Sequence, residues 1–416
     1  MGVSLQPVTP DNSASILRLS SRANRSKGIS IVKTSLALLF LGLCGAAGTV
    51  LYKEAQTSFY QSREISRYAA KLTYTTQPGK SDAIRYPVEG PFDERLGYVK
   101  LPQMLDRLQN RNYDIVSQTR FSPEMMRYTE LGLFPPYVEK THAGLEARDC
   151  RNDALYNFRY PRRGYDNFGI VPNLVVQSLL FIENRSLLDE NQKFLNPAVD
   201  WGRFAKAAAC QVAKLVGAPR QSMGGSTLAT QMEKYRHSPD GVTSAAKDKL
   251  LQMASASVRA YQNGPETLGT RRTLVLSYLN TVPLSAAPGY GEVNGLGDGL
   301  YVWFGADFET VNRLLSSAEV KPEDLNAQAL ALRQVIALMI AHRRPSYYLA
   351  KGRDELAKLT DSYIRIMAKT GAIPWSLREA ALKQPLHYRD FATDPAVAPM
   401  ETNKGINVVR SRLNMM

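Results

Sequence analysis

The chain centres on one stretch, Ser222-Met223-Gly224-Gly225-Ser226-Thr227-Leu228-Ala229-Thr230-Gln231-Met232-Glu233-Lys234. Its two adjacent glycines allow backbone angles that other residues avoid, and they let the main chain approach a ligand closely. The hydroxyl pair that follows is typical of a helix cap, so a helix is predicted to begin here. Free amide groups at such a turn can bind an anion. Taken alone, the run is most often only a turn with a helix cap. The blocks around it favour a functional motif.

Five further blocks accompany this stretch. Phe181-Ile182-Glu183-Asn184-Arg185 precedes it, at the end of an apolar run that begins at Asn173 and predicts a buried helix. A partly desolvated carboxylate at such a helix end can act as a base, whereas a surface glutamate paired with Arg185 would be inert. The later blocks follow in chain order: Lys249 to Met253, Tyr278-Leu279-Asn280, Trp303-Phe304-Gly305, and Ala331 to Tyr347, which predicts a buried helix that ends in Arg343-Arg344-Pro345-Ser346-Tyr347.

In this order the blocks resemble the family 51 glycosyltransferases, the peptidoglycan polymerase domain of bifunctional penicillin-binding proteins and of monofunctional transglycosylases. The resemblance covers roughly residues 170 to 385 and implies a mainly α-helical, lysozyme-like domain. The second motif of the family is matched at six positions: Gly224, Gly225, Ser226, Thr227, Gln231 and Lys234. Ala229 and Thr230 depart from it.

The resemblance also implies a reaction, the polymerisation of lipid II into glycan chains. Glu183 falls on the family glutamate that deprotonates the acceptor sugar, and Gln252 falls on the second glutamate. Lys234 and Lys249 would stabilise the departing diphosphate, a role that Mg²⁺ can share. No other cofactor is implied, and no residue is assigned as a metal ligand. The expected substrate-binding residues are Gly224, Gly225, Ser226, Thr227, Gln231, Lys234, Lys249 and Asn280.

Several positions depart from the family pattern. Asn184 replaces an aspartate, Leu187 a phenylalanine and Asp248 an arginine. The histidine that follows the base glutamate in the first motif of the family has no counterpart here. With Gln252, these departures keep a second hypothesis open, a catalytically weak relative that binds lipid-linked precursor or glycan and recruits other cell-wall enzymes. A third is a lysozyme-like hydrolase that uses Glu183 as an acid.

Three short matches mimic the signatures of a penicillin-binding transpeptidase. They are Ser244-Ala245-Ala246-Lys247, Tyr278-Leu279-Asn280 and Lys369-Thr370-Gly371. The third signature must lie on a strand, whereas the pattern here predicts a helix end with Gly371 at its cap. We therefore expect no transpeptidase.

The composition narrows the partners. The 416 residues carry a net charge of +14, with a sequence pI near 9.6, which favours an anionic partner. Nucleic acid is disfavoured because zinc-finger spacing and basic-aromatic RNA signatures are missing from the sequence. Anionic lipid and a phosphate-bearing substrate remain as the candidate partners.

Cys150 and Cys210 could form one disulfide or stay as two thiols. The four histidines show no metal-ligand spacing: His142, His237, His342 and His387.

Thr34 to Tyr52 is an apolar run without charge, long enough to span a bilayer. Its continuation to Tyr52 favours an uncleaved anchor over a signal peptide. Basic residues dominate the segment before it, so the N-terminus is expected in the cytoplasm and the rest of the chain outside, on a bacterial inner membrane. The expected organisation is a cytoplasmic tail, an anchor, an α+β accessory spacer, a transglycosylase domain and a C-terminal helical segment: residues 1–28, 29–53, 54–150, 151–349 and 350–416.

Within the accessory region the pattern predicts a helix over Leu101 to Leu108 and strands over Tyr113 to Val116 and Thr119 to Phe121. We expect this region to act as a spacer that sets the height of the active site above the membrane.

Overall fold

The computed structural model describes residues 16–84, 90–202, 210, 226–316 and 322–396, and isolated residues beyond 406. It is mainly helical, as predicted, with three small antiparallel sheets of two strands each among the described residues. The chain divides into two compact units, Met1–Thr57 and Ser58–Met416. The cysteines Cys44, Cys150 and Cys210 are free thiols.

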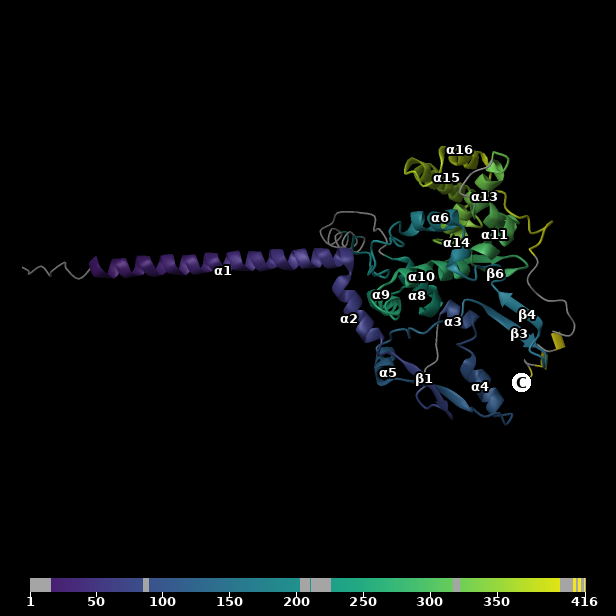
Figure 1. The fold of residues 1–416 in the computed structure, drawn as a ribbon, viewed down its shortest axis with the longest axis horizontal. Coiled ribbons are helices and arrows are strands. Elements are labelled where there is room, and N and C mark those ends of the chain that lie inside the picture. The colour runs from purple at the N-terminus through teal and green to yellow at the C-terminus, as the bar shows by residue number, and fades with distance from the viewer. Residues whose placement is uncertain are drawn as a thin grey trace, which may run out of the picture. The chain divides into compact units, whose positions relative to one another are not determined.

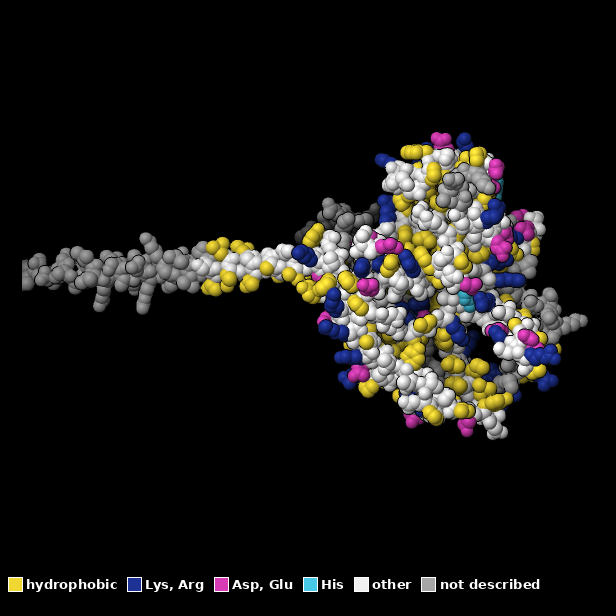
Figure 2. Space-filling model, viewed as in Figure 1, with side chains coloured by type: hydrophobic (Ala, Val, Ile, Leu, Met, Phe, Trp, Pro, Cys, Tyr) yellow, Lys and Arg dark blue, Asp and Glu magenta, His cyan; other side chains and the backbone are white. Residues whose placement is uncertain are grey.

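The first unit contains α1, Ile16–Thr57. Its segment Ser35–Thr57 has a mean hydropathy of 1.9 and none of it is buried. Figure 2 shows apolar side chains along the coloured part of this segment with few charges among them. Among the described residues it is the one helix long and apolar enough to cross a membrane, which is consistent with a single-pass anchor or a signal sequence. The helix stops where Ser58 takes a left-handed backbone conformation, φ +54°.

The second unit begins with a small α+β region. Its elements are α2 Phe59–Ala69, β1 Tyr74–Pro78, α3 Pro91–Arg95, α4 Leu101–Gln109, β2 Ser117–Phe121 and α5 Pro123–Glu130. The predicted helix is confirmed as α4, and the second predicted strand lies within β2. The strand predicted over Tyr113 to Val116 is wrong. The ladder of β2 with β1 starts only at the Pro78–Ser117 pair, because Gly79 turns the partner chain away at φ +77°.

A hairpin of β3 Ala143–Arg148 and β4 Ala154–Tyr160 follows and was not predicted. The helical body then comprises η1 Phe168–Ile170, α6 Asn173–Glu183, α8 Leu228–His237, η2 Pro239–Gly241, α9 Ala246–Ala260, α10 Leu268–Thr281, β5 Pro283–Ala287, β6 Gly291–Asn294, α11 Leu296–Phe304, α12 Phe308–Ser316, α13 Leu325–Ala341, α14 Pro345–Tyr348, α15 Arg353–Lys369 and α16 Trp375–Lys383.

The core of this body is α13. Every residue from 331 to 341 is buried, which explains why apolar residues lie on all sides of this helix, with Arg333 and Gln334 as the polar residues of the run. Helices α6, α11, α12, α15 and α16 pack against it, and α8 packs against α9 and α10 (Figure 1). Because α6 and α13 are packed together, the ends of both helices lie close to one another, and both contribute to the site below.

Two glycines occupy positions where the backbone requires this residue. At Gly295, φ is +79°, and an added Cβ would lie 2.5 Å from the carbonyl oxygen of Asn280, so this close approach requires glycine. Gly371, at φ +76°, turns the chain after α15. Lys369 ends that helix, so Lys369-Thr370-Gly371 has a helix cap and not the strand that a transpeptidase signature requires.

Candidate active site

Glu183 ends α6 and is buried, with 6% of its surface exposed. Three side chains from two other parts of the chain surround its carboxylate. The side-chain amide of Gln231 on α8 donates to Oε2 over 2.9 Å. His342 and Arg343, which directly follow α13, place Nε2 and Nη2 at 3.4 and 3.7 Å from Oε1. Both carboxylate oxygens therefore have polar or cationic neighbours, which fixes the orientation of the group.

His342 is a second candidate for handling a proton here. It is buried, and its Nδ1 lies within hydrogen-bonding distance of the carbonyl oxygen of Met339. Burial lowers the pKa of His342, although the carboxylate of Glu183 opposes that effect. A neutral imidazole that donates from Nδ1 keeps a lone pair on Nε2, the atom that faces Glu183. The imidazole can therefore accept a proton that Glu183 has taken up.

Lys234 and Lys249 form the cationic part of the site. Lys249 donates from Nζ to the Ser226 hydroxyl over 2.9 Å, which ties α9 to the start of α8. Burial lowers the pKa of Lys234, and the charge of Lys249 lowers it further. Burial also lowers the pKa of Lys249. Two mutually repelling ammonium groups, partly shielded from water, favour an anionic ligand between them.

The motif hydroxyls have local roles as well. Thr227 caps α8: its hydroxyl accepts from the Thr230 amide over 3.3 Å, and the Thr230 hydroxyl accepts from the Thr227 amide over 2.9 Å. This reciprocal pair is the helix start that the sequence predicted, with threonine in place of the usual Glu or Gln. Gly224 and Gly225, expected to offer backbone donors, lie outside the described residues.

Residues 151–369, more than half of the chain, match the family model of the transglycosylases. The chain belongs to this family. A comparison with curated proteins found no match. The match confirms the resemblance drawn from the motifs, and the family is one of peptidoglycan glycosyltransferases, whose substrates are lipid II and glycan.

Two of the predicted site residues of this transglycosylase are engaged within the protein. Gln252 on α9 is 3% exposed, and its amide donates to the hydroxyls of Ser238 and Thr243 over 2.9 and 3.1 Å. Asn280, also 3% exposed, accepts from the amide of Tyr165 and donates to its carbonyl, each over 2.8 Å. Both amides hold segments of the fold together, and their roles toward substrate stay predictions.

The donors around Glu183 do not suit Mg²⁺. That ion prefers several hard oxygen ligands, but the neighbours of this carboxylate are an amide nitrogen, an imidazole and a guanidinium. At the position of the second family glutamate, Gln252 presents an amide that is already bonded to hydroxyls. Within the described ranges, no three His, Cys, Asp or Glu side chains are grouped as metal ligands. This donor set therefore does not place Mg²⁺ at Glu183.

Sequence reasoning missed a set of charged residues on the other side of α8, called here the buried ion cluster: Asp93, Glu139, Glu233, Arg236, His237 and Arg259. Glu139 Oε2 lies 2.9 Å from Arg236 Nε, and its Oε1 lies 2.9 Å from His237 Nε2. Arg259 Nε donates to Glu233 over 2.6 Å. The cluster joins α3, α8, α9 and the segment before β3.

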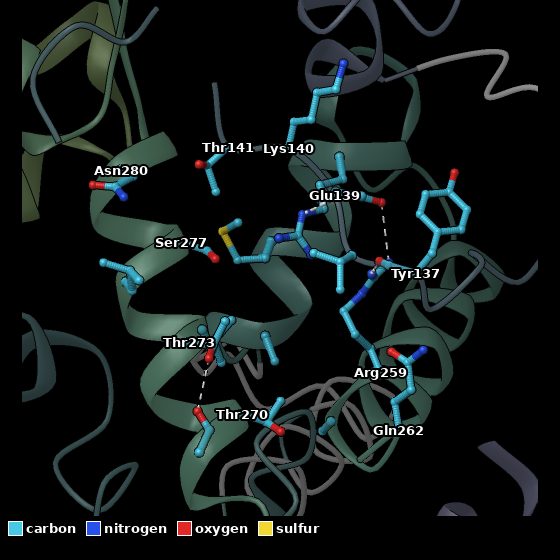
Figure 3. Close-up of a pocket in the computed structure, with 18 of the residues that line it drawn as sticks. Tyr137, Glu139, Lys140, Thr141, Arg259, Gln262, Thr270, Thr273, Ser277 and Asn280 are labelled. Atoms are coloured by element: carbon cyan, nitrogen blue, oxygen red, sulfur yellow. Dashed lines mark hydrogen bonds and ion pairs between the residues drawn. The ribbon is translucent and has the colours of Figure 1, made fainter. Parts of the chain in front are cut away.

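The cluster borders a cavity of about 950 Å³. Figure 3 shows polar side chains of α10 along one wall, among them Thr270, Thr273 and Ser277, with Glu139 and Arg259 on the opposite side. The cavity also contacts residues 229, 232, 233 and 236 of α8. Residues 231 and 234, which belong to the candidate active site, lie on the opposite face of that helix because 3.6 residues complete a turn. The cavity and the Glu183 site are therefore separate features.

Proposed function

We propose that this transglycosylase polymerises lipid II into glycan chains, releases undecaprenyl diphosphate and has no transpeptidase activity. The observation that carries the proposal is the buried carboxylate of Glu183, held by Gln231 from the glycine-rich motif, with a lysine pair on the same motif and on α9. A base and an anion-binding group are the two elements that glycosyl transfer to a sugar hydroxyl requires.

In the proposed reaction, Glu183 takes the proton from the 4-hydroxyl of the acceptor sugar. The resulting oxygen nucleophile attacks the anomeric carbon of the lipid-linked donor from the side opposite the diphosphate. The new glycosidic bond forms as the carbon–oxygen bond to the diphosphate breaks, so the configuration inverts. Lys234 and Lys249 stabilise the negative charge that develops on the departing diphosphate. The proton on Glu183 can pass to Nε2 of His342 before the next cycle.

The proposal is tested by incubating the purified full chain with labelled lipid II in detergent and separating the products by length. Polymerised chains support it. Binding without product would instead favour the weak relative that holds precursor or glycan as a scaffold for other cell-wall synthesis proteins, a second candidate motivated by Gln252 and Asn184. Cleavage of preformed glycan would favour the hydrolase.

Lys249→Met should lower kcat by about 10²-fold, because removing one preorganised group that stabilises developing charge has an effect of this order. The measurement is the initial rate of glycan synthesis at saturating lipid II. Lys247→Met is the matched control, since Lys247 lies on the same helix but is exposed, and its rate should be unchanged. Equal rates for the two variants would remove Lys249 from the mechanism.

Gln252→Glu should raise both turnover and dependence on Mg²⁺. The substitution restores the second carboxylate of the family, and the hydroxyls of Ser238 and Thr243 can rotate to donate to it, so the fold should tolerate the charge. Rates of wild type and variant are compared with Mg²⁺ and with a chelator. Identical rates under both conditions would show that this position does not tune metal use.

We infer that α1 anchors the protein once in the bacterial inner membrane, with residues 1–28 cytoplasmic, 29–53 within the bilayer, and the segments 54–150, 151–349 and 350–416 on the periplasmic or outer side. This placement agrees with an apolar N-terminal helix and with a lipid-linked substrate on that side.

A reporter enzyme that is active only outside the cytoplasm should therefore work when fused after residue 416. A parallel fusion to a reporter that requires the cytoplasm should be inactive. The reverse pair of results would invert the orientation and separate the site from its substrate.

A further inference from the structure

The two faces of helix α8 contact different parts of the protein. On one face, Gln231 holds the carboxylate of Glu183 and Lys234 lies in the cationic part of the site. On the opposite face and at its C-terminal end, Glu233, Arg236 and His237 belong to the buried ion cluster. A shift or rotation of α8 would therefore move Gln231 away from Glu183, so whatever fixes the back of this helix also sets the geometry of the site.

Glu139 lies in the segment before β3 and contacts all three basic residues of the cluster. Its side chain is 1% exposed and contacts Arg236 at 2.9 Å, His237 at 2.9 Å and Arg259 at 3.5 Å. Burial raises the pKa of Glu139, but Arg236, Arg259 and His237 outweigh that effect and lower it below its usual range. Burial opposes the charge on His237, but Glu139 and Asp93 outweigh it and raise the pKa of His237 to about 9. Three acidic side chains, Asp93, Glu139 and Glu233, thus face three basic ones, Arg236, His237 and Arg259.

The rest of the region before residue 150 supports the same contact. Asp93 on α3 lies 2.9 Å from Nδ1 of His237. A Cβ added to Gly90, just before α3, would lie 2.2 Å from the Arg236 carbonyl oxygen, so the two backbones are in close contact. The Phe134 ring lies 4.6 Å from the His237 ring, centroid to centroid, and the Phe134 amide donates to Ser255 on α9.

Arg259 completes the link to α9. Its Nη1 and Nη2 donate to the carbonyls of Tyr137 and Pro135 over 2.7 and 3.1 Å, on either side of Pro136 in the segment that leads to Glu139. Helices α8 and α9, which carry Lys234 and Lys249, are therefore both fixed to the same short segment, residues 134–139. A region that only spaced the site from the membrane would not need buried charges, because burying an ion costs free energy unless it is fully paired.

We propose that Glu139 is a positioning residue for this reaction: through the buried ion cluster it holds α8 in the orientation that presents Gln231 to Glu183. The region of residues 54–150 is then part of the catalytic architecture and not only a spacer. The proposal rests on the proposed function for its kinetic consequence, while its structural consequence can be measured without activity.

The test compares Glu139→Gln with Glu146→Gln. Glu146 lies on β3 in the same region, but its ion pair with Arg148 is at the surface, so this control should behave as wild type. Glu139→Gln keeps the shape and removes the charge. It should speed hydrogen exchange of the amides of Leu228–His237 and lower kcat by about 10- to 100-fold, with KM within about twofold, because misplacement of a site by about 1 Å has effects of this order. Glu139→Asp, which keeps the charge, should recover part of both losses.

A double-mutant cycle separates positioning from general loss of stability. If Glu139 acts through Gln231, the variant Glu139→Gln/Gln231→Ala should be no slower than the slower single variant. Additive losses in kcat would overturn the proposal, and so would unchanged exchange in α8. If Glu139→Gln does not fold, the comparison of exchange and kcat between Glu139→Asp and wild type decides in the same way. If the wild type makes no glycan, the proposed function fails, but the exchange measurement still tests the contact.

Discussion

Glu183→Gln is expected to lower the rate of glycan synthesis by about 10²- to 10⁴-fold, the range that a general base contributes. The substitution removes the proton acceptor and changes the shape little. Gln231, His342 and Arg343 still surround the side chain, so folding and binding of lipid II should be retained. The measurement is the initial rate at saturating lipid II, with binding measured separately.

The matched control for this variant is Glu190→Gln. Glu190 is 73% exposed at its side chain and pairs with Arg272 at the surface, so its rate should equal that of wild type. Turnover by Glu183→Gln at the rate of the control would exclude Glu183 as the base. The buried ion cluster and the lysine pair would then need another role.

The second large effect concerns stability. Arg259→Met should lower the free energy of unfolding by about 3–5 kcal/mol, because it leaves the carboxylates of Glu139 and Glu233 buried with less compensation. Two backbone carbonyls also lose a donor. The measurement is denaturant unfolding of the purified chain in detergent, followed by circular dichroism.

Arg272→Met is the control for that experiment. Its pair with Glu190 is 45% and 73% exposed at the two side chains, and the loss of such a surface pair should cost less than about 1 kcal/mol. If Arg259→Met and Arg272→Met unfold at the same denaturant concentration, the cluster contributes no more to the free energy of unfolding than a surface pair. The claim that the charges of the cluster hold α8 in place would then be wrong.

Local patterns predicted the elements that carry the chemistry. A hydroxyl pair after two glycines located the start of α8 at Leu228, and an apolar run located α6 and placed Glu183 at its end. These features depend on residues within one or two helical turns of each other, where capping and periodicity act. The helix over Leu101 to Leu108 was predicted for the same reason.

Features that depend on distant contacts were not predictable. Glu139 meets Arg236 and Arg259 across roughly a hundred residues, and in the sequence it is an ordinary charge in a polar segment. The error over Tyr113 to Val116 arose because the partner strand β1, and not local propensity, sets where β2 begins.

His342 was also missed as a site residue. Its one signal was its position at the end of an apolar helix, and only the packing of α13 against α6 brings its ring to Glu183. A search for metal-ligand spacing among the histidines could not find this residue, because its contact with Glu183 comes from the packing of two helices and not from sequence spacing.

The most direct measurement follows both products of the proposed reaction at once, with lipid II labelled in its disaccharide and in its lipid. The full chain should release one undecaprenyl diphosphate for each disaccharide added to glycan. Glu183→Gln should form both products far more slowly than the wild type. Saturable binding of lipid II by the wild type with neither product formed, with or without added Mg²⁺, would contradict the proposed polymerase and leave a precursor-binding protein.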